Sequence, residues 1–164
     1  MLYYQIYHSP IGELILSSDG DNLVGINFCQ NPKLLEEFSS KLALVNSDLF
    51  SRTIKWLDIY FSGQDPGSAP QTFLKATKFR QDVLKIVSGI PYGKTLTYGE
   101  IAQQVAVKYH QVKMSAQAVG TAVGKNPIAI IIPCHRVVGS GKNLLNYSGG
   151  IDRKLHLLRL EGIL

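Results

Sequence analysis

Residues 128–136 have the sequence Ile128-Ala129-Ile130-Ile131-Ile132-Pro133-Cys134-His135-Arg136, in which an apolar run meets three reactive side chains. A β-branched run of this kind is typical of a buried strand. Pro133 has no N–H to give to a sheet and keeps the preceding residue extended. The sequence therefore predicts a buried strand over 128–132, with Cys134 at its end. A lone cysteine there is most often a small core residue, and that alternative stays open.

The neighbours of Cys134 favour a reactive thiol over a core residue. The thiolate is the nucleophilic form of cysteine, and it is favoured by a base such as His135 and by the positive charge of Arg136. Successive side chains of an extended segment point to opposite sides, so His135 can act on the sulfur through a water. Glu161 is a candidate carboxylate to orient the imidazole. The alternatives are a structural histidine and surface or salt-bridge roles for Arg136 and Glu161.

Upstream of this run, the sequence predicts two short helices in tandem. Thr97 can cap a helix that begins with Tyr98, and Ser115 can cap a second helix that ends at Gly124. Such a pair indicates a helix-turn-helix, although the connection over 108–113 is longer than the roughly 3–4 residues of the standard motif. A pair of core helices without a DNA role is the alternative.

The first half of the chain has a strand pattern followed by a helix pattern. Three apolar runs separated by turn residues predict an antiparallel meander, with strands at 3–8, 13–18 and 23–28. Helical periodicity begins at Pro32 and recurs through Phe61. Residues 63–70 are rich in Gly, Pro and polar side chains, so we expect a linker there.

These patterns predict an α/β (α+β) fold with two domains, 1–75 and 76–164. The first is a small antiparallel sheet with helices. The second is mostly helical, of helix-turn-helix or winged-helix type, and carries the active site.

The net charge changes sign between the two expected domains. Residues 1–75 hold 5 Lys and Arg against 8 Asp and Glu, a balance of −3, whereas residues 76–164 hold 12 against 4, a balance of +8. A basic second half favours a polyanionic partner, of which nucleic acid is the usual one. A solvated basic surface without a partner is the alternative.

Composition excludes several classes of protein. The chain is 45% hydrophobic and 18% charged, as in soluble globular proteins, and no apolar run approaches the roughly 20 residues of a membrane span. The N-terminus lacks the regions of a signal peptide, so we expect a cytoplasmic protein without a membrane partner. Cys29 and Cys134 are the only cysteines, too few for a disulfide framework or a four-cysteine zinc site. We expect no metal and no cofactor.

Further motifs surround the cysteine run and give the chain a family resemblance. They are Asn126-Pro127, Ile132-Pro133-Cys134-His135-Arg136-Val137-Val138, Asn146-Tyr147-Ser148-Gly149-Gly150, Leu160-Glu161-Gly162, Pro91-Tyr92-Gly93 with Tyr98, and Ala118-Val119-Gly120. With them, residues 76–164 closely resemble the methylated-DNA–protein-cysteine methyltransferases, or O6-alkylguanine-DNA alkyltransferases. The first domain is more weakly similar, through Ser9-Pro10-Ile11-Gly12 and its order of strands and helices. The resemblance implies a ribonuclease-H-like domain at 1–75 and a DNA-binding and catalytic alkyltransferase domain at 76–164.

The resemblance implies DNA repair by stoichiometric transfer of an alkyl group, chiefly methyl, to Cys134. The donor would be O6-alkylguanine, and also O4-alkylthymine, in double-stranded DNA. His135 would deprotonate Cys134 through water, Glu161 would orient His135, and Asn126 would support the site.

The resemblance also implies a set of residues that bind substrate or DNA. Tyr98 and Ser148 would donate hydrogen bonds to the extruded guanine, and Tyr147 and Gly149 would help to form the pocket loop. The remaining implied contacts are Gln117, Ala118, Gly120, Lys125 and Arg136.

The chemistry of such a transfer sets further expectations. A cysteine at the end of a buried element requires the base to leave the duplex. Displacement of O6 leaves a purine anion, which the Tyr98 hydroxyl can protonate or stabilise. Water does not cleave the product thioether under mild conditions, so we expect one turnover per molecule. We also expect a monomer.

Two positions depart from the family pattern. Gln117 stands where the family usually has an arginine that fills the space of the extruded base, so we expect slower extrusion or looser DNA binding. Cys29 and His8 are too few for the zinc site that some members have in the first domain.

Two other functions use the same features. A cysteine hydrolase would turn over repeatedly through a labile acyl-enzyme. A non-catalytic lesion binder of the alkyltransferase-like type would lack the reactive cysteine, so the presence of Cys134 argues against it.

Overall fold

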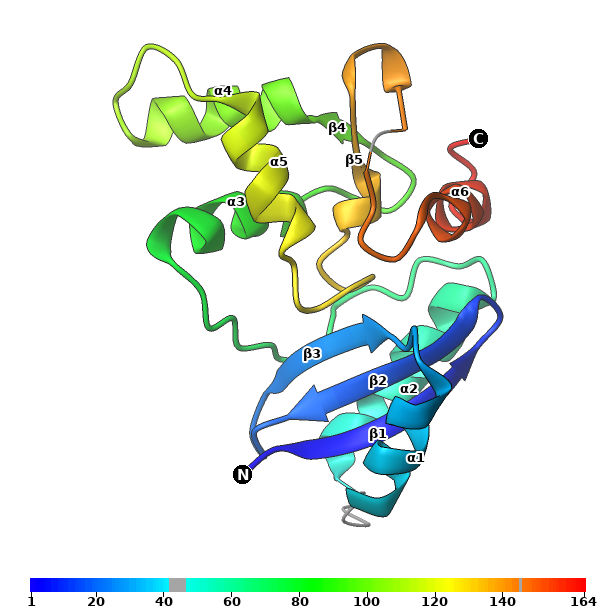
Figure 1. Ribbon diagram of the computed structural model, residues 1–164. Helices are drawn as coiled ribbons and strands as arrows, with labels where there is room; N and C mark the ends of the chain where they lie inside the picture. Colours follow the sequence, from blue (N-terminus) through cyan, green and yellow to red (C-terminus); the bar gives the residue numbers. More distant parts are fainter. Residues whose placement is uncertain (42–46, 145) are drawn as a thin grey trace. The chain divides into compact units, whose positions relative to one another are not determined.

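The computed structural model describes residues 1–41, 47–144 and 146–164. The chain forms two compact units, each described here by itself (Figure 1). The first unit consists of Met1–Lys75 and Pro127–Ala129, and the second of Ala76–Asn126 and Ile130–Leu164. A short piece of the second half thus belongs to the first unit, which the sequence did not predict.

The first unit contains a three-stranded antiparallel sheet in the order β1-β2-β3. Its strands are β1 (Tyr3–Ser9), β2 (Gly12–Ser18) and β3 (Leu23–Phe28). Gly12 opens β2 with a φ of 121°, a conformation that side chains disfavour. In the second turn, the Asp19 carboxylate accepts the N–H groups of Asp21 and Asn22. The predicted meander is confirmed.

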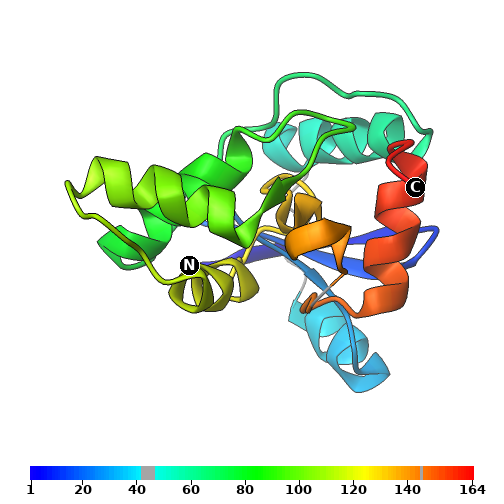
Figure 2. The same cartoon turned by 90° about the horizontal axis from the view of Figure 1, so that it is seen from above.

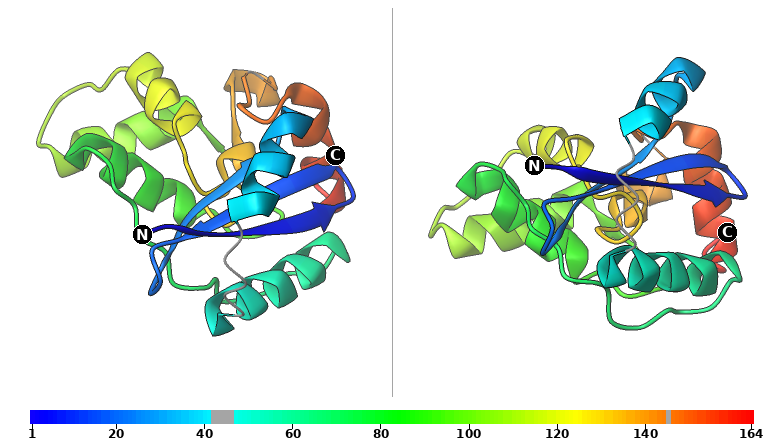
Figure 3. Two further views of the ribbon diagram at one scale, coloured as in Figure 1. Left: turned by 60° about the horizontal axis from the view of Figure 1, so that its bottom comes forward. Right: turned by 90° about the horizontal axis from the view of Figure 1, so that it is seen from below.

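Helices α1 (Pro32–Lys41) and α2 (Asp48–Phe61) cover opposite faces of this sheet (Figure 3). Tyr4 of β1 contacts Phe38 of α1, with ring centroids 4.8 Å apart. Tyr7 of the same strand donates a hydrogen bond of 2.8 Å to Asp58 of α2. Side chains three apart on a strand point to opposite faces, so the period of two decides which helix each tyrosine meets.

Three helices form the core of the second unit: α3 (Lys78–Ser88), α4 (Tyr98–Lys108) and α5 (Ala116–Gly124) (Figure 2). The predicted caps are confirmed, because Thr97 accepts the N–H of Glu100 in a capping box and Ser115 accepts the N–H of Ala118. The buried Asp82 of α3 accepts hydrogen bonds from Lys78, Lys108 and Tyr109, which fixes α3 to the end of α4.

The rest of the second unit carries the cysteine run. Its elements are β4 (Leu96–Thr97), the 3-10 turns η1 (Cys134–Arg136) and η2 (Ser140–Lys142), β5 (Val137–Val138) and α6 (Ile151–Leu160). Strands β4 and β5 pair in parallel, so the segment after η1 is fixed beside the start of α4. None of the described helices has both the length and the apolar character that a bilayer crossing requires.

The predicted strand over 128–132 is wrong. Ile128 makes a single bridge to Ile26, and the next residues form turns, with Ile130 at a φ of 70°. Ile128, Ile130 and Ile132 are nonetheless buried. The apolar pattern therefore predicted correctly that these side chains are buried, but it did not specify a strand, because a turn inside the protein can bury them equally well. Cys134 starts a 3-10 turn and does not follow a strand.

Candidate active site

The Cys134 side chain is held by an asparagine at the end of α5. Cys134 is 4% exposed. The Asn126 amide donates to the Ile132 carbonyl at 2.8 Å and to the Cys134 sulfur at 3.2 Å. Burial raises the pKa of the Cys134 thiol, and the Asn126 hydrogen bond and the charge of Lys154 oppose this. One amide thus fixes the loop and gives the sulfur a donor that favours its anion.

Behind the sulfur, His135 and Glu161 form a buried pair. His135 Nε2 lies 2.6 Å from Glu161 Oε1, and both side chains are fully buried. Glu161 is the C-cap residue of α6, and its Oε2 also accepts the N–H of Gly93 at 3.0 Å. The structure thus brings together two residues that the sequence could only propose as partners.

The same carboxylate binds Arg136 in a bidentate pair. Arg136 Nε donates to Glu161 Oε2 at 2.8 Å, and Nη2 donates to Oε1 at 3.1 Å. Arg136 Nη1 donates to the Ile90 carbonyl at 2.7 Å. The guanidinium is therefore buried among protein acceptors, in contrast to the expected contact with DNA or substrate. This geometry favours a role in fixing Glu161.

This network selects one form of the histidine. Glu161 is held as an acceptor by Arg136, so His135 Nε2 carries the hydrogen that it donates to Oε1, and Nδ1 is the basic nitrogen. Burial lowers the pKa of His135. The positive charges of Arg136 and Lys154 lower it further, whereas Glu161 acts to raise it. We infer that the imidazole is neutral at neutral pH and able to accept a proton.

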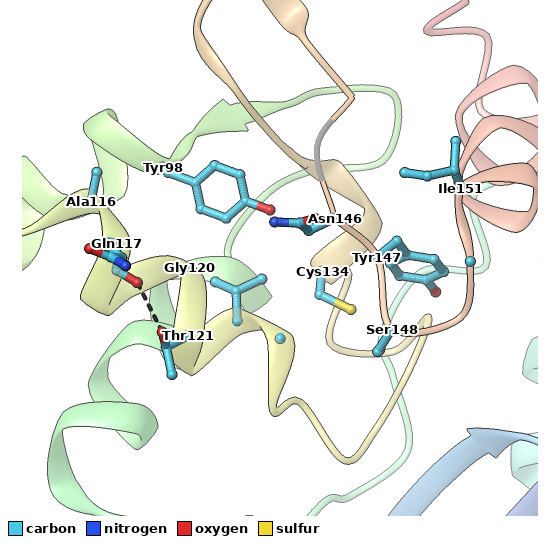
Figure 4. Close-up of a pocket in the computed structure, with 13 residues that line it drawn as sticks. Tyr98, Ala116, Gln117, Gly120, Thr121, Cys134, Asn146, Tyr147, Ser148 and Ile151 are labelled. Atoms are coloured by element: carbon cyan, nitrogen blue, oxygen red, sulfur yellow. Dashed lines mark hydrogen bonds between the residues drawn. The ribbon is translucent and has the colours of Figure 1, made fainter.

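A pocket of about 780 Å³ opens onto the cysteine (Figure 4). Its walls come from the start of α4, the exposed side of α5, the η1 turn and the loop before α6. The lining residues are Tyr98, Ala116, Gln117, Gly120, Thr121, Val123, Gly124, Cys134, Asn146, Tyr147, Ser148, Gly150 and Ile151. The small residues of α5 that line the pocket, Ala116, Gly120 and Gly124, leave its backbone close to the opening.

Two tyrosines line this pocket on either side of Cys134. The Tyr98 hydroxyl points into it from α4, and Tyr147 lies on the other side of Cys134 (Figure 4). Burial raises the pKa of both, and negative charge on Cys134 adds to the effect. The Tyr147 hydroxyl is buried without a hydrogen-bond partner among the described residues. Both phenols are therefore neutral, and that of Tyr98 is a donor directed at a space large enough for a purine.

Most of the predicted site residues meet here, and a few lie elsewhere. Tyr98, Gln117, Gly120, Cys134, Tyr147 and Ser148 line the pocket. Asn126, His135, Arg136 and Glu161 form the hydrogen-bonded network around Cys134 and do not line the pocket. The other three belong to neither group: Ala118 is half-buried on α5, Lys125 is exposed at its C-cap, and the buried Gly149 accepts a hydrogen bond from Arg153 through its carbonyl.

One buried residue was missed by the sequence prediction. Lys154 of α6 is fully buried, and its Nζ donates to the Val137 carbonyl at 2.7 Å. A signal was present, because Lys154 lies three and four residues before Leu157 and Leu158, on the buried side of the helix. Among the described residues, no group of three or more His, Cys, Asp or Glu side chains is placed to hold a metal ion.

Two family models match the chain. The 6-O-methylguanine DNA methyltransferase DNA binding domain matches residues 78–163, and the ribonuclease-like domain of the same name matches residues 2–67. Similar proteins named methylated-DNA–protein-cysteine methyltransferase occur in Methanosarcina acetivorans and Mycobacterium leprae. The first is 38% identical and covers 98% of this chain and 99% of its own; the second is 40% identical and covers 98% and 93%.

Solved structures with the same fold include two from Mycobacterium tuberculosis. An O6-methylguanine methyltransferase is 38% identical with a TM-score of 0.79, and covers 98% of this chain and 93% of its own. OGT in complex with DNA is 37% identical with a TM-score of 0.80, and covers 97% and 92%.

Proposed function

Because the chain belongs to the 6-O-methylguanine DNA methyltransferase family, we propose that it repairs DNA by moving an alkyl group, chiefly methyl, from guanine O6 to its own Cys134. DNA is its partner, and the alkylated guanine its specific substrate. One observation carries the choice of residue: the Cys134 sulfur accepts a hydrogen bond from Asn126 and opens onto the large pocket.

The geometry supports a displacement with a defined path for each proton. The Cys134 proton leaves through a water to His135 Nδ1, and Glu161 stabilises the imidazolium that forms. The sulfur attacks the alkyl carbon, an S–C bond forms, and the C–O6 bond breaks with its electron pair on the purine. The purine anion takes a proton from Tyr98, which the imidazolium can restore.

The pocket walls fit the recognition of a base that has left the duplex. Tyr98 and Ser148 supply hydroxyl groups around the space, and the rings of Tyr98 and Tyr147 supply apolar surface. The α5 side, with Gln117 at the opening, would face the DNA, and the exposed Lys125 at its end would contact phosphate. We assign residues 76–164 to this DNA-binding and catalytic role and residues 1–75 to a ribonuclease-H-like domain.

Intact-protein mass after mixing with duplex DNA that contains O6-methylguanine tests the proposal. We expect one added methyl per molecule, located at Cys134 by peptide mapping, with an equal amount of repaired guanine. Cys134→Ala should abolish the transfer and keep some DNA binding, whereas the matched Cys29→Ala should transfer normally. Unmodified protein, or repair that exceeds the protein in amount, would refute the proposal and favour a binder or a hydrolase.

We further propose that the protein is a cytoplasmic monomer and that each molecule reacts once, without a cofactor. We also propose that it accepts O4-alkylthymine as a second substrate. The thioether product leaves no labile bond for a second cycle. Light scattering measures the molar mass with and without DNA, and a mass of two or more chains without DNA would contradict the monomer. The mass assay repeated with O4-methylthymine DNA tests the second substrate, and an unchanged protein mass would exclude it.

A further inference from the structure

A buried lysine beside the turn that carries the cysteine has no part in the steps described above. Lys154 lies on α6 with its side chain fully buried. Taking an ammonium group out of water is costly, and proteins almost never bury a lysine fully without a compensating interaction. The position of this charge therefore has a physical cause.

The ammonium group is attached to the turn that carries the sulfur. Lys154 Nζ donates to the Val137 carbonyl at 2.7 Å. The N–H of the same Val137 donates to the Cys134 carbonyl and closes the η1 turn. Helix α6 packs directly on this turn. The charge is thus held at a fixed place relative to Cys134.

The buried charges of the site balance when Cys134 is a thiolate. Arg136 and Glu161 form a bidentate pair and offset each other. His135 is neutral at rest, and Tyr98 and Tyr147, which face the sulfur from α4 and the pocket loop, stay neutral because their pKa values are raised. Among the described residues, Lys154 adds a further buried positive charge, and negative charge on the Cys134 sulfur complements it.

The two groups influence each other in both directions. The charge of Lys154 acts to lower the pKa of Cys134, against the larger effect of burial. Burial lowers the pKa of Lys154 to about 8, and negative charge on Cys134 acts to raise it. Such reciprocity is required of two titrating groups that interact.

We propose that the Lys154 ammonium is the counter-charge that stabilises the Cys134 thiolate during alkyl transfer. The inference rests on the proposed role of Cys134 as the acceptor. No bond to Lys154 forms or breaks: the thiol proton goes to His135, the S–C bond forms as the C–O6 bond breaks, and Lys154 keeps its three protons.

The test measures thiolate reactivity without DNA, so its failure is distinct from a failure of repair. Iodoacetamide is added at several pH values, and the rate at Cys134 is followed by peptide mass, with Cys29 as an internal control. In Lys154→Met we expect the Cys134 rate at pH 7 to fall at least about 10-fold below that of the wild type. The reason is that a nearby opposite charge shifts the pKa of such a group by about one unit or more. The Cys29 rate should not change.

Three variants decide between charge and packing. Lys154→Arg keeps the charge and should react faster at Cys134 than Lys154→Met, and Lys85→Met, on the exposed side of α3, should match the wild type. Equal Cys134 rates in wild type and Lys154→Met, or in Lys154→Met and Lys154→Arg, would overturn the proposal. Should Lys154→Met not fold, ¹³C NMR of the lysine Cε atoms replaces it. The Lys154 midpoint should be lower in Cys134→Ser than in wild type, and equal midpoints would overturn the proposal.

Discussion

Replacing Glu161 by glutamine should destabilise the protein far more than an exposed glutamate-to-glutamine change. The Glu161 carboxylate accepts two hydrogen bonds from Arg136, one from the Gly93 N–H and one from His135. The two Arg136 N–H groups and the Gly93 N–H can only donate hydrogen bonds, whereas the imidazole of His135 can also accept one. In either orientation, the NH₂ group of a glutamine would face at least one of them, and Arg136 would lose its buried counter-charge.

The size of the effect follows from these contacts. Removing one partner of a buried ion pair costs about 3–5 kcal/mol. The glutamine oxygen keeps part of the network, so we expect a loss of about 3 kcal/mol, a large part of the roughly 5–15 kcal/mol that stabilises a typical domain.

Urea unfolding followed by circular dichroism at 222 nm measures this loss, and Glu100→Gln is the matched control. Glu100 accepts the Thr97 N–H at 2.7 Å in an exposed capping box, so its change should cost less than about 1 kcal/mol. A cost for Glu161→Gln below about 1 kcal/mol, or equal to that of the control, would refute this account of the network.

Three further predictions concern the helices of the second unit. Ser115→Ala removes the side chain that accepts the Ala118 N–H, so it should destabilise the protein by about 1 kcal/mol in urea unfolding; no measurable loss would mean that the cap does not hold α5. Hydrogen bonds from Lys108, Lys78 and Tyr109 hold the pKa of Asp82 below its usual 3.8, so its contribution to stability is present above about pH 4 and is lost as the pH falls through the folded pKa. Wild type should therefore lose more stability between pH 4 and 2 than Asp82→Asn, and parallel curves would contradict the assignment. Gln117→Arg should increase DNA affinity or repair rate, measured by fluorescence anisotropy and single-turnover methyl transfer, because an arginine can fill the space of the extruded base; if both stay unchanged, Gln117 is not at the DNA surface.

Much of the local structure could be predicted from the sequence because its causes are local. The apolar runs in residues 3–28 and the turn residues between them specify the meander. Thr97 and Ser115 start α4 and α5 by accepting N–H groups three residues away. The chemistry of Cys134 was indicated by its neighbours, and the family by motifs along the chain.

The tertiary structure decided what depends on residues far apart in sequence. The run 128–132 has the composition of a strand, but where it packs it forms turns, because burial and not strand pairing is what its side chains require. Arg136 had the charge of a DNA contact, yet Glu161, 25 residues away, binds it inside the protein. Lys154 had the charge of a surface residue, yet it is buried beside the turn of Cys134. A sequence shows which charges a chain carries, whereas only the fold brings distant charges together, and their interaction depends on that distance and on the exclusion of water.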